Sequence, residues 1–145
     1  MIWRSWRPWW RSTIGRRDTS ATASSRTSAA VWPASEAPAL VLIEQMLTAG
    51  ATVVVTDPVA IEPARRLLGD RVRFEASNYD CADGADVLAL VTEWHQYRRP
   101  DFDRLKRAMR SPVIFDGRNI WDPNEMRAQG FAYQGIGRGT AAHKP

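Results

Sequence analysis

Apolar or alternating runs are separated by amphipathic segments along most of this chain, from about Glu36 to Arg138. Such runs are typical of strands, and they predict five of them, at residues 51–56, 71–76, 86–92, 112–116 and 131–136. The segments around them predict helices, at residues 36–49, 61–68, 78–84, 101–110 and 123–129. Glycines at helix ends support these limits, at positions 50, 69, 84 and 130.

The order of these elements determines the predicted fold class. Strands that alternate with helices at this spacing require right-handed crossovers, which give a mostly parallel sheet covered by helices on both faces. The sequence therefore predicts an α/β, Rossmann-like, doubly wound domain of about five strands. In open sheets of this kind, ligands bind beyond the carboxyl ends of the strands.

Residues 1–33 differ from the rest of the chain in composition and in hydrophobic pattern. They hold five of the seven tryptophans and six arginines, with few aliphatic residues and no sustained period, which predicts a disordered Arg/Trp/Ser-rich leader. Three interpretations stay open: a translation artefact or functionless leader, an arm that adsorbs to anionic lipid or nucleic acid, and an organellar transit peptide. The expected organisation is thus a leader at 1–33, an incomplete domain at 34–139 and a flexible tail at 140–145.

Composition and charge narrow the class of protein. A chain of 145 residues with 44% hydrophobic and 25% charged residues fits one globular domain. No apolar run approaches the roughly 20 residues that span a bilayer, so no membrane span is expected. The pI near 9.8 comes from residues 1–33, which carry a net charge of +5 against a total of +4. The nearly neutral remainder indicates no specific nucleic-acid partner.

The single cysteine, Cys81, cannot form an internal disulfide, so a cytoplasmic location is expected. Asp80 and Asp83 beside it should raise its pKa, which predicts a neutral structural thiol and not a nucleophile. His95 and His143 lack metal-ligand spacing, so neither a metal site nor a catalytic residue is predicted. A phospho-receiver domain is disfavoured, because the paired acids and the lysine of such a site are missing.

Polar residues follow the predicted strands and should meet at one edge of the sheet. The candidate rim residues are Asp57, Thr92, Glu93, Trp94, Asp116, Gly117, Arg118 and Asn119. Arg118 stands out, because Gly117 permits a tight turn and a guanidinium can bind a phosphate or carboxylate as a fork. Alternatively, Arg118 pairs with Asp116 or Asp122 to hold the turn.

Other rim residues also have two interpretations. Asp57 can contact a ribose hydroxyl or cap the following helix, and capping is favoured because no Gly-rich turn precedes it. Trp94 can line a pocket or cover a helix. The stretch Gly135–Gly139 is expected to be a flexible exit from the last strand, since no helix follows it to receive a phosphate.

Several blocks, in order, resemble the UDP-binding C-terminal domain of the UDP-glucose/GDP-mannose dehydrogenase family, and in particular UDP-glucose 6-dehydrogenases. Together they cover about 100 residues. They read EAPAL (36–40), LIEQMLTAGATV (42–53), DPV (57–59), ARRLLGDRV (64–72), GADVLALVTEW (84–94), PDFDRLK (100–106), SPVIFDGRNIWDP (111–123) and FAYQGIGR (131–138).

This resemblance implies a function. Such enzymes oxidise a UDP-hexose to the uronate, as in polysaccharide biosynthesis, with NAD and a cysteine-bound intermediate. By resemblance, Arg118, with Gly117 and Asp116, contacts the UDP-sugar. The family's NAD domain, central helical region and catalytic cysteine motif have no counterpart here, so we expect a fragment that is inactive alone. The alternative is a nucleotide-sugar-binding module that complements another chain; a homodimer or a partner supplying the missing domain would fit either case.

The chain departs from the family pattern at the first strand. Where family members have a strand ending in Phe-Lys, then an Asp-rich loop and an arginine, this chain reads TSAAVWPAS, with Ser35 in place of the arginine. The first strand would be central in the order 3-2-1-4-5-6, so its loss would leave two strand edges unpaired and prone to aggregation or pairing with another chain. Ser28–Trp32 is a candidate for a short, poor replacement.

Overall fold

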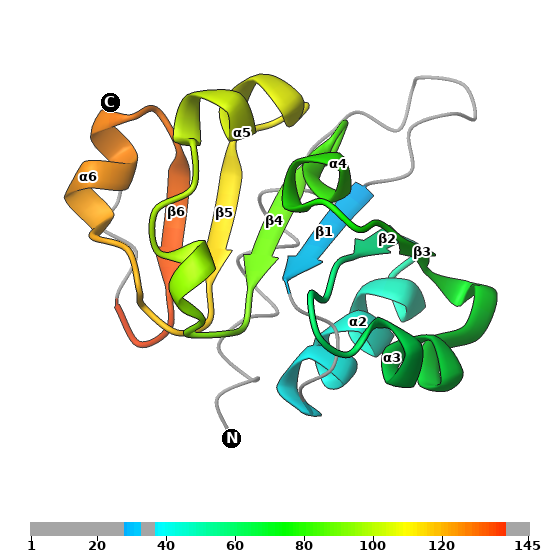
Figure 1. Ribbon diagram of the computed structural model, residues 1–145. Coiled ribbons are helices and arrows are strands. Elements are labelled where there is room, and N and C mark those ends of the chain that lie inside the picture. The colour runs from blue at the N-terminus through cyan, green and yellow to red at the C-terminus, as the bar shows by residue number, and fades with distance from the viewer. Residues whose placement is uncertain (1–27, 33–36, 139–145) are drawn as a thin grey trace.

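The protein is described by a computed structural model that covers residues 28–32 and 37–138. Within these residues, six parallel strands form one sheet, and five α-helices lie along it (Figure 1). The strands are β1 Ser28–Trp32, β2 Thr52–Val55, β3 Arg73–Phe74, β4 Val87–Leu90, β5 Val113–Asp116 and β6 Ala132–Gly135. The helices are α2 Ala37–Thr48, α3 Ile61–Leu68, α4 Asn78–Ala82, α5 Phe102–Ala108 and α6 Pro123–Ala128.

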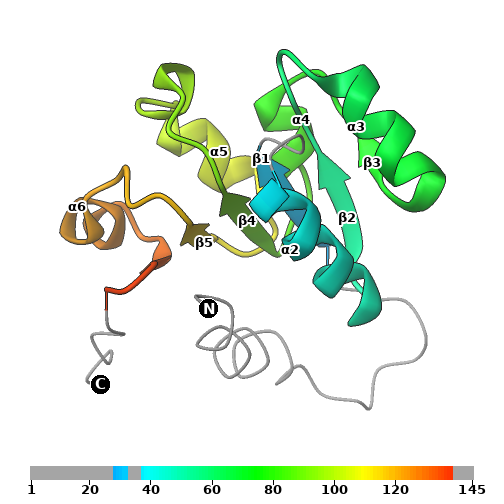
Figure 2. The same ribbon diagram turned by 90° about the horizontal axis from the view of Figure 1, so that it is seen from below.

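The strand order β3-β2-β1-β4-β5-β6 confirms the doubly wound, Rossmann-like class. Two cores lie on opposite faces of the sheet. One packs β-strand side chains against α2 and α3, through residues such as Ile43 and Leu68. The other packs the opposite face against α4, α5 and α6, through Cys81, Leu105 and Met126. Figure 2 shows α2 and the α4–α5 pair on the two sides of the sheet.

The central strand corrects two predictions. β1 occupies the place of the central strand, which was expected to be missing or poorly replaced. The described sheet has six strands and not about five, and β2 and β4 each pair with β1. Ser28–Trp32, the candidate replacement, is the segment that forms it, and its Ala29 to Trp32 side chains are buried. Residues 28–32, which were predicted to belong to the disordered leader at 1–33, are therefore part of the sheet. The rest of the leader and the tail at 140–145 lie outside the described residues.

Both ends of β1 are fixed by polar contacts. The Ser28 backbone N–H donates to the Asp86 carboxylate at 2.9 Å, and Arg110 Nη1 lies 3.1 Å from the same oxygen. At the other end, the Trp32 carbonyl accepts from the Val91 N–H at 2.8 Å. The Trp32 ring stacks on Tyr97 with centroids 5.2 Å apart, and both side chains are fully buried. Small alanines let β1 fit between two helix layers, while Trp32 fills the space at its end.

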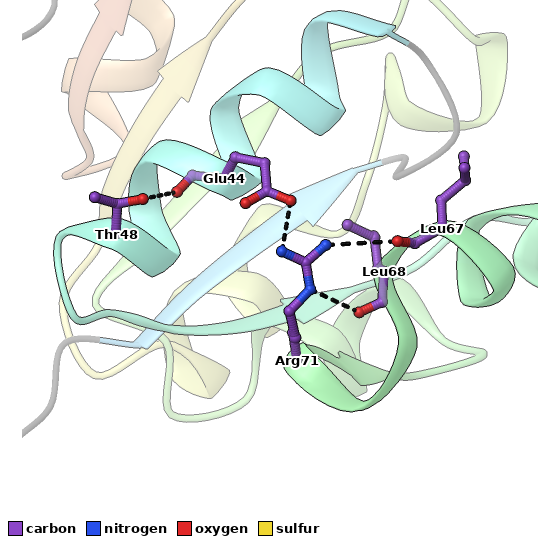
Figure 3. A network of polar contacts seen from close by, with 5 residues as sticks. All are labelled: Glu44, Thr48, Leu67, Leu68 and Arg71. Carbon is purple, nitrogen blue, oxygen red and sulfur yellow. Dashed lines mark hydrogen bonds and ion pairs between the residues drawn. The ribbon is translucent and has the colours of Figure 1, made fainter.

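A polar network joins α2 to the connection between α3 and β3 (Figure 3). Arg71 Nη1 lies 2.6 Å from the Glu44 carboxylate, and the Arg71 guanidinium also donates to the carbonyls of Leu68 and Leu67. The Thr48 hydroxyl donates to the Glu44 carbonyl at 2.8 Å, one turn away on α2. Because both charged side chains are about half exposed, the ion pair contributes less than about 1 kcal/mol to stability.

Most elements lie where the sequence predicted them. α3 begins and ends at the predicted residues, and Gly69 after it has φ 57°. β3 is shorter than predicted, because Gly69–Arg71 form a 3-10 turn and only Arg73 and Phe74 pair with β2. A second 3-10 turn, His95–Tyr97, was not predicted. In the part of the chain that the structure describes, no helix has both the length and the apolar character to cross a bilayer.

Candidate functional site

The carboxyl ends of β4, β5 and β6 lie next to one another, because these strands are parallel neighbours. This edge carries Thr92–Trp94 after β4, Gly117–Asn119 after β5 and Ile136–Arg138 after β6. Asp57 follows β2, with β1 lying between β2 and β4. The predicted site residues therefore share one rim of the sheet, and those after β4 and β5 are the ones brought together.

The buried carboxylate of Asp116 organises the turn after β5. Its Oδ1 accepts the Arg118 backbone N–H at 2.9 Å, and its Oδ2 accepts the Trp121 N–H at 3.1 Å. The Tyr133 hydroxyl lies 2.8 Å from Oδ2 and 3.0 Å from the Trp121 carbonyl. Burial and the bond to Asp116 raise the pKa of Tyr133 far above its ordinary value, so it remains a neutral donor. The Asp116 side chain thus faces the protein interior.

Gly117 is needed because two backbones come very close. Its N–H donates to the Leu90 carbonyl at 2.7 Å, which extends the β4–β5 pairing by one residue. A Cβ at this position would lie 2.9 Å from the same carbonyl oxygen, closer than side-chain carbons normally approach. A larger residue would therefore push β5 from β4 and displace the turn that carries Arg118.

The exposed side chain of Arg118 extends from this turn toward the end of β4. Its Nε donates to the Val91 carbonyl at 3.2 Å, and its Nη1 lies 3.7 Å from the Glu93 carboxylate. The sequence suggested Asp116 or Asp122 as the partner of the Arg118 guanidinium, but the carboxylate nearest to it in this ion pair is that of Glu93. Because Glu93 is 62% exposed, the pair is weak.

Asn119 links the β5 turn to the end of β6. It has φ 55°, a conformation that asparagine tolerates better than most residues. Its Nδ2 donates to the Ile136 carbonyl at 2.8 Å. Its Oδ1 is buried and forms no hydrogen bond with the described residues. A Cβ on Gly135 would clash with this oxygen, so Gly135 is required for Asn119 to pack here.

The remaining rim residues have contacts that fit local structural roles. Asp57 is buried, and its Oδ1 accepts the N–H groups of Val59 and Ala60 at 3.0 and 2.8 Å, just before α3. These bonds hold the turn that leads into α3. The helix itself begins after Ala60 without a side-chain cap, so Asp57 does not cap it in the way that the sequence favoured. Thr92 is also buried, and its hydroxyl accepts the Trp94 N–H at 3.4 Å. Trp94 itself is half-buried against the core beneath α4 and α5.

The environment of Cys81 matches a structural thiol. The side chain is fully buried on α4, and its Sγ donates to the Val54 carbonyl at 3.4 Å. Burial raises the pKa of this thiol to about 12, with smaller opposing contributions from hydrogen bonds. It therefore stays protonated near neutral pH and cannot act as a nucleophile there. Desolvation, and not the neighbouring aspartates invoked from sequence, is the main cause.

Three residues near Arg118 were not identified from the sequence. Tyr133 and Trp121 hold the Asp116 carboxylate and the loop around it, and Trp121 Nε1 donates to the Tyr97 carbonyl at 3.1 Å. Arg138 lies at the end of β6, with Nη1 3.4 Å from the Trp121 carbonyl. Tyr133 and Arg138 stand in the closing FAYQGIGR block and Trp121 in the SPVIFDGRNIWDP block, but their contacts depend on the pairing of β5 with β6.

Residues 34–123 match the model of the UDP-glucose/GDP-mannose dehydrogenase family, UDP binding domain. The chain belongs to this family. The matched segment includes the FDGR block with Asp116, Gly117 and Arg118. The membership suggested by resemblance is therefore confirmed.

Individual relatives agree with the family model. The chain is 44% identical over 113 residues to a UDP-glucose 6-dehydrogenase of Pseudomonas aeruginosa, covering 74% of this chain and 25% of that protein. It is 39% identical over 103 residues to one of Rhizobium meliloti, covering 71% of this chain and 23% of the relative. An NDP-N-acetyl-D-galactosaminuronic acid dehydrogenase from Methanosarcina mazei superposes with a TM-score of 0.67 at 28% identity, over 83% of this chain and 26% of that structure. The chain thus spans about a quarter of the length of these relatives.

Proposed function

We propose that the rim formed by the ends of β4 and β5 binds the UDP part of a nucleotide sugar, and that Arg118 is its main contact to the anionic diphosphate. The supporting observation is the turn after β5, where Asp116 holds the Arg118 backbone and Gly117 lets the turn approach β4. A guanidinium at this edge can bind a phosphate through two parallel N–H donors. Asp116 and Gly117 position Arg118, while Glu93, Trp94 and Asn119 border it.

In this proposal the domain serves a UDP-glucose 6-dehydrogenase, which would oxidise UDP-glucose to UDP-glucuronate with NAD. Its own residues do not fit a dinucleotide at the first strand. A dinucleotide turn needs glycines directly after that strand, whereas here β1 ends in a buried Trp32 and is followed by Pro-Ala-Ser-Glu. NAD would therefore be held by another domain or by a partner chain.

The Arg118→Ala variant tests this site. Loss of a charge-assisted contact to phosphate is expected to weaken UDP binding about tenfold or more, with little change in stability because the side chain is exposed. Calorimetric titration of the full chain with UDP measures the effect. Arg107→Ala is the matched control, since Arg107 is exposed on the last turn of α5 and should leave affinity unchanged.

Two outcomes would count against the proposal. If the unmodified chain shows no heat of binding with UDP at millimolar concentrations, the domain lacks the proposed function. If it binds UDP and Arg118→Ala binds equally well, the site lies elsewhere on the domain.

A further inference from the structure

Arg138 is held close to the loop that carries Arg118. After β6 the chain turns at Gly137, which has φ 66°, and the Gln134 side chain fixes this turn by donating to the Arg138 carbonyl at 2.8 Å. The Ile136 N–H donates to the Asp116 carbonyl at 3.2 Å, which continues the β5–β6 pairing. The segment predicted to be a flexible exit is, through Arg138, a turn with defined contacts.

The Arg138 side chain crosses the end of the sheet. Its Cδ would lie 3.3 Å from a Cβ built on Gly135, so its aliphatic part runs over that glycine. At its tip, Nη1 donates weakly to the Trp121 carbonyl at 3.4 Å. Arg138 is exposed, and among residues 28–32 and 37–138 no carboxylate forms an ion pair with it. Since a guanidinium has five N–H donors, most of its capacity for hydrogen bonding remains available to a ligand.

Asn119 connects the two arginines. It follows Arg118 directly, and its Nδ2 bond to the Ile136 carbonyl fixes the β5 turn to the segment that leads into Arg138. The Arg118 side chain extends toward β4 and Arg138 lies over β6, so they flank the end of β5. A ligand that spans this strand end would meet a positive charge on each side.

We propose that Arg138 is a second phosphate-binding residue, which together with Arg118 neutralises the diphosphate of the bound nucleotide sugar. This inference rests on the proposed function of the rim. A diphosphate carries more charge than one arginine can neutralise, and Glu93 offsets part of the charge of Arg118. Arg138 supplies the missing charge from a side chain that is already oriented, which lowers the conformational cost of binding.

A purely structural role would give a different pattern. If Arg138 only holds the loop through the Trp121 carbonyl, its loss would disturb Arg118 and Asn119. The affinity of the rim for every ligand would then fall by the same factor. If Arg138 binds phosphate, its loss would lower the affinity for each ligand in proportion to the ligand's phosphate charge.

Titrations of the full chain with UDP, UMP and uridine separate these roles. Arg138→Ala and Arg138→Gln are both expected to weaken UDP binding about tenfold, UMP binding less, and uridine binding not at all. The glutamine variant retains an N–H donor for Trp121, so it removes the charge with the least effect on the loop. Arg107→Ala again serves as the control for loss of an exposed arginine.

Each result is decisive. Unchanged UDP affinity in both variants, with Arg118→Ala still weakened, overturns the role of Arg138 and leaves the proposed function intact. Equal losses for UDP and uridine assign Arg138 to holding the loop and also overturn the inference. Failure of the unmodified chain to bind UDP removes both proposals together.

Discussion

Removal of residues 1–32 is expected to abolish the cooperative unfolding transition of the domain, whereas removal of residues 1–27 should preserve it. The two truncations differ only by β1, which pairs with β2 on one side and with β4 on the other. Without it, both neighbours expose backbone donors and acceptors in the middle of the sheet, and the buried side chains of Ala29 to Trp32 leave both cores. No other described segment is placed to restore this pairing.

Urea or thermal denaturation followed by circular dichroism measures this difference. The longer truncation should give a broad, non-cooperative change or aggregated material, and the shorter one a single transition. If both truncated proteins unfolded cooperatively with similar midpoints, β1 would contribute little to the stability of the domain, and the account of its central position would be wrong.

The second large effect is expected for Asp116→Ala. This change leaves the backbone N–H groups of Arg118 and Trp121 and the Tyr133 hydroxyl without their buried acceptor. Hydrogen bonds to a buried charge are costly to break from one side, so the free energy of unfolding should fall by about 3 kcal/mol. Urea denaturation measures this loss.

Tyr133→Phe is the matched control for that experiment. It removes one donor to Asp116 and keeps the ring in the core, so it should cost about 1 kcal/mol. If Asp116→Ala also lost 1 kcal/mol or less, the carboxylate would not organise this turn.

Elements with strong local signals were predictable from the sequence. Helix α3 and Gly69 were placed correctly because glycine marks a helix end through its backbone freedom. Strands β2, β4 and β5 were recognised because continuous β-branched and apolar runs fit only positions buried on both faces. The position of Arg118 at the carboxyl end of β5 followed directly from these limits.

Elements that depend on distant partners were less predictable. β1 contains two alanines and has weak strand propensity, so it forms because two neighbouring strands require a partner. The 3-10 turn at His95–Tyr97 is stabilised by the stacking of Tyr97 on Trp32, 65 residues earlier in numbering, which no local pattern reveals.

The same limit applies to the site. Sequence position placed Asp116 on the rim, but its burial and its inward contacts result from the packing of Tyr133 and Trp121 around it. The approach of Arg138 to the β5 loop requires β6 to lie beside β5, which is a property of the whole sheet. Residue types thus indicate where a ligand binds, and tertiary contacts determine which side chains face it.

The most direct test of the central claim is a titration of ¹⁵N-labelled protein with UDP, followed by nuclear magnetic resonance. The account predicts that amide shifts concentrate at residues 92–94 and 116–119, with no change on α3. Shifts confined to the opposite edge of the sheet, around Gly84 and Gly130, or no shifts at millimolar UDP, would contradict the claim that this rim binds the nucleotide.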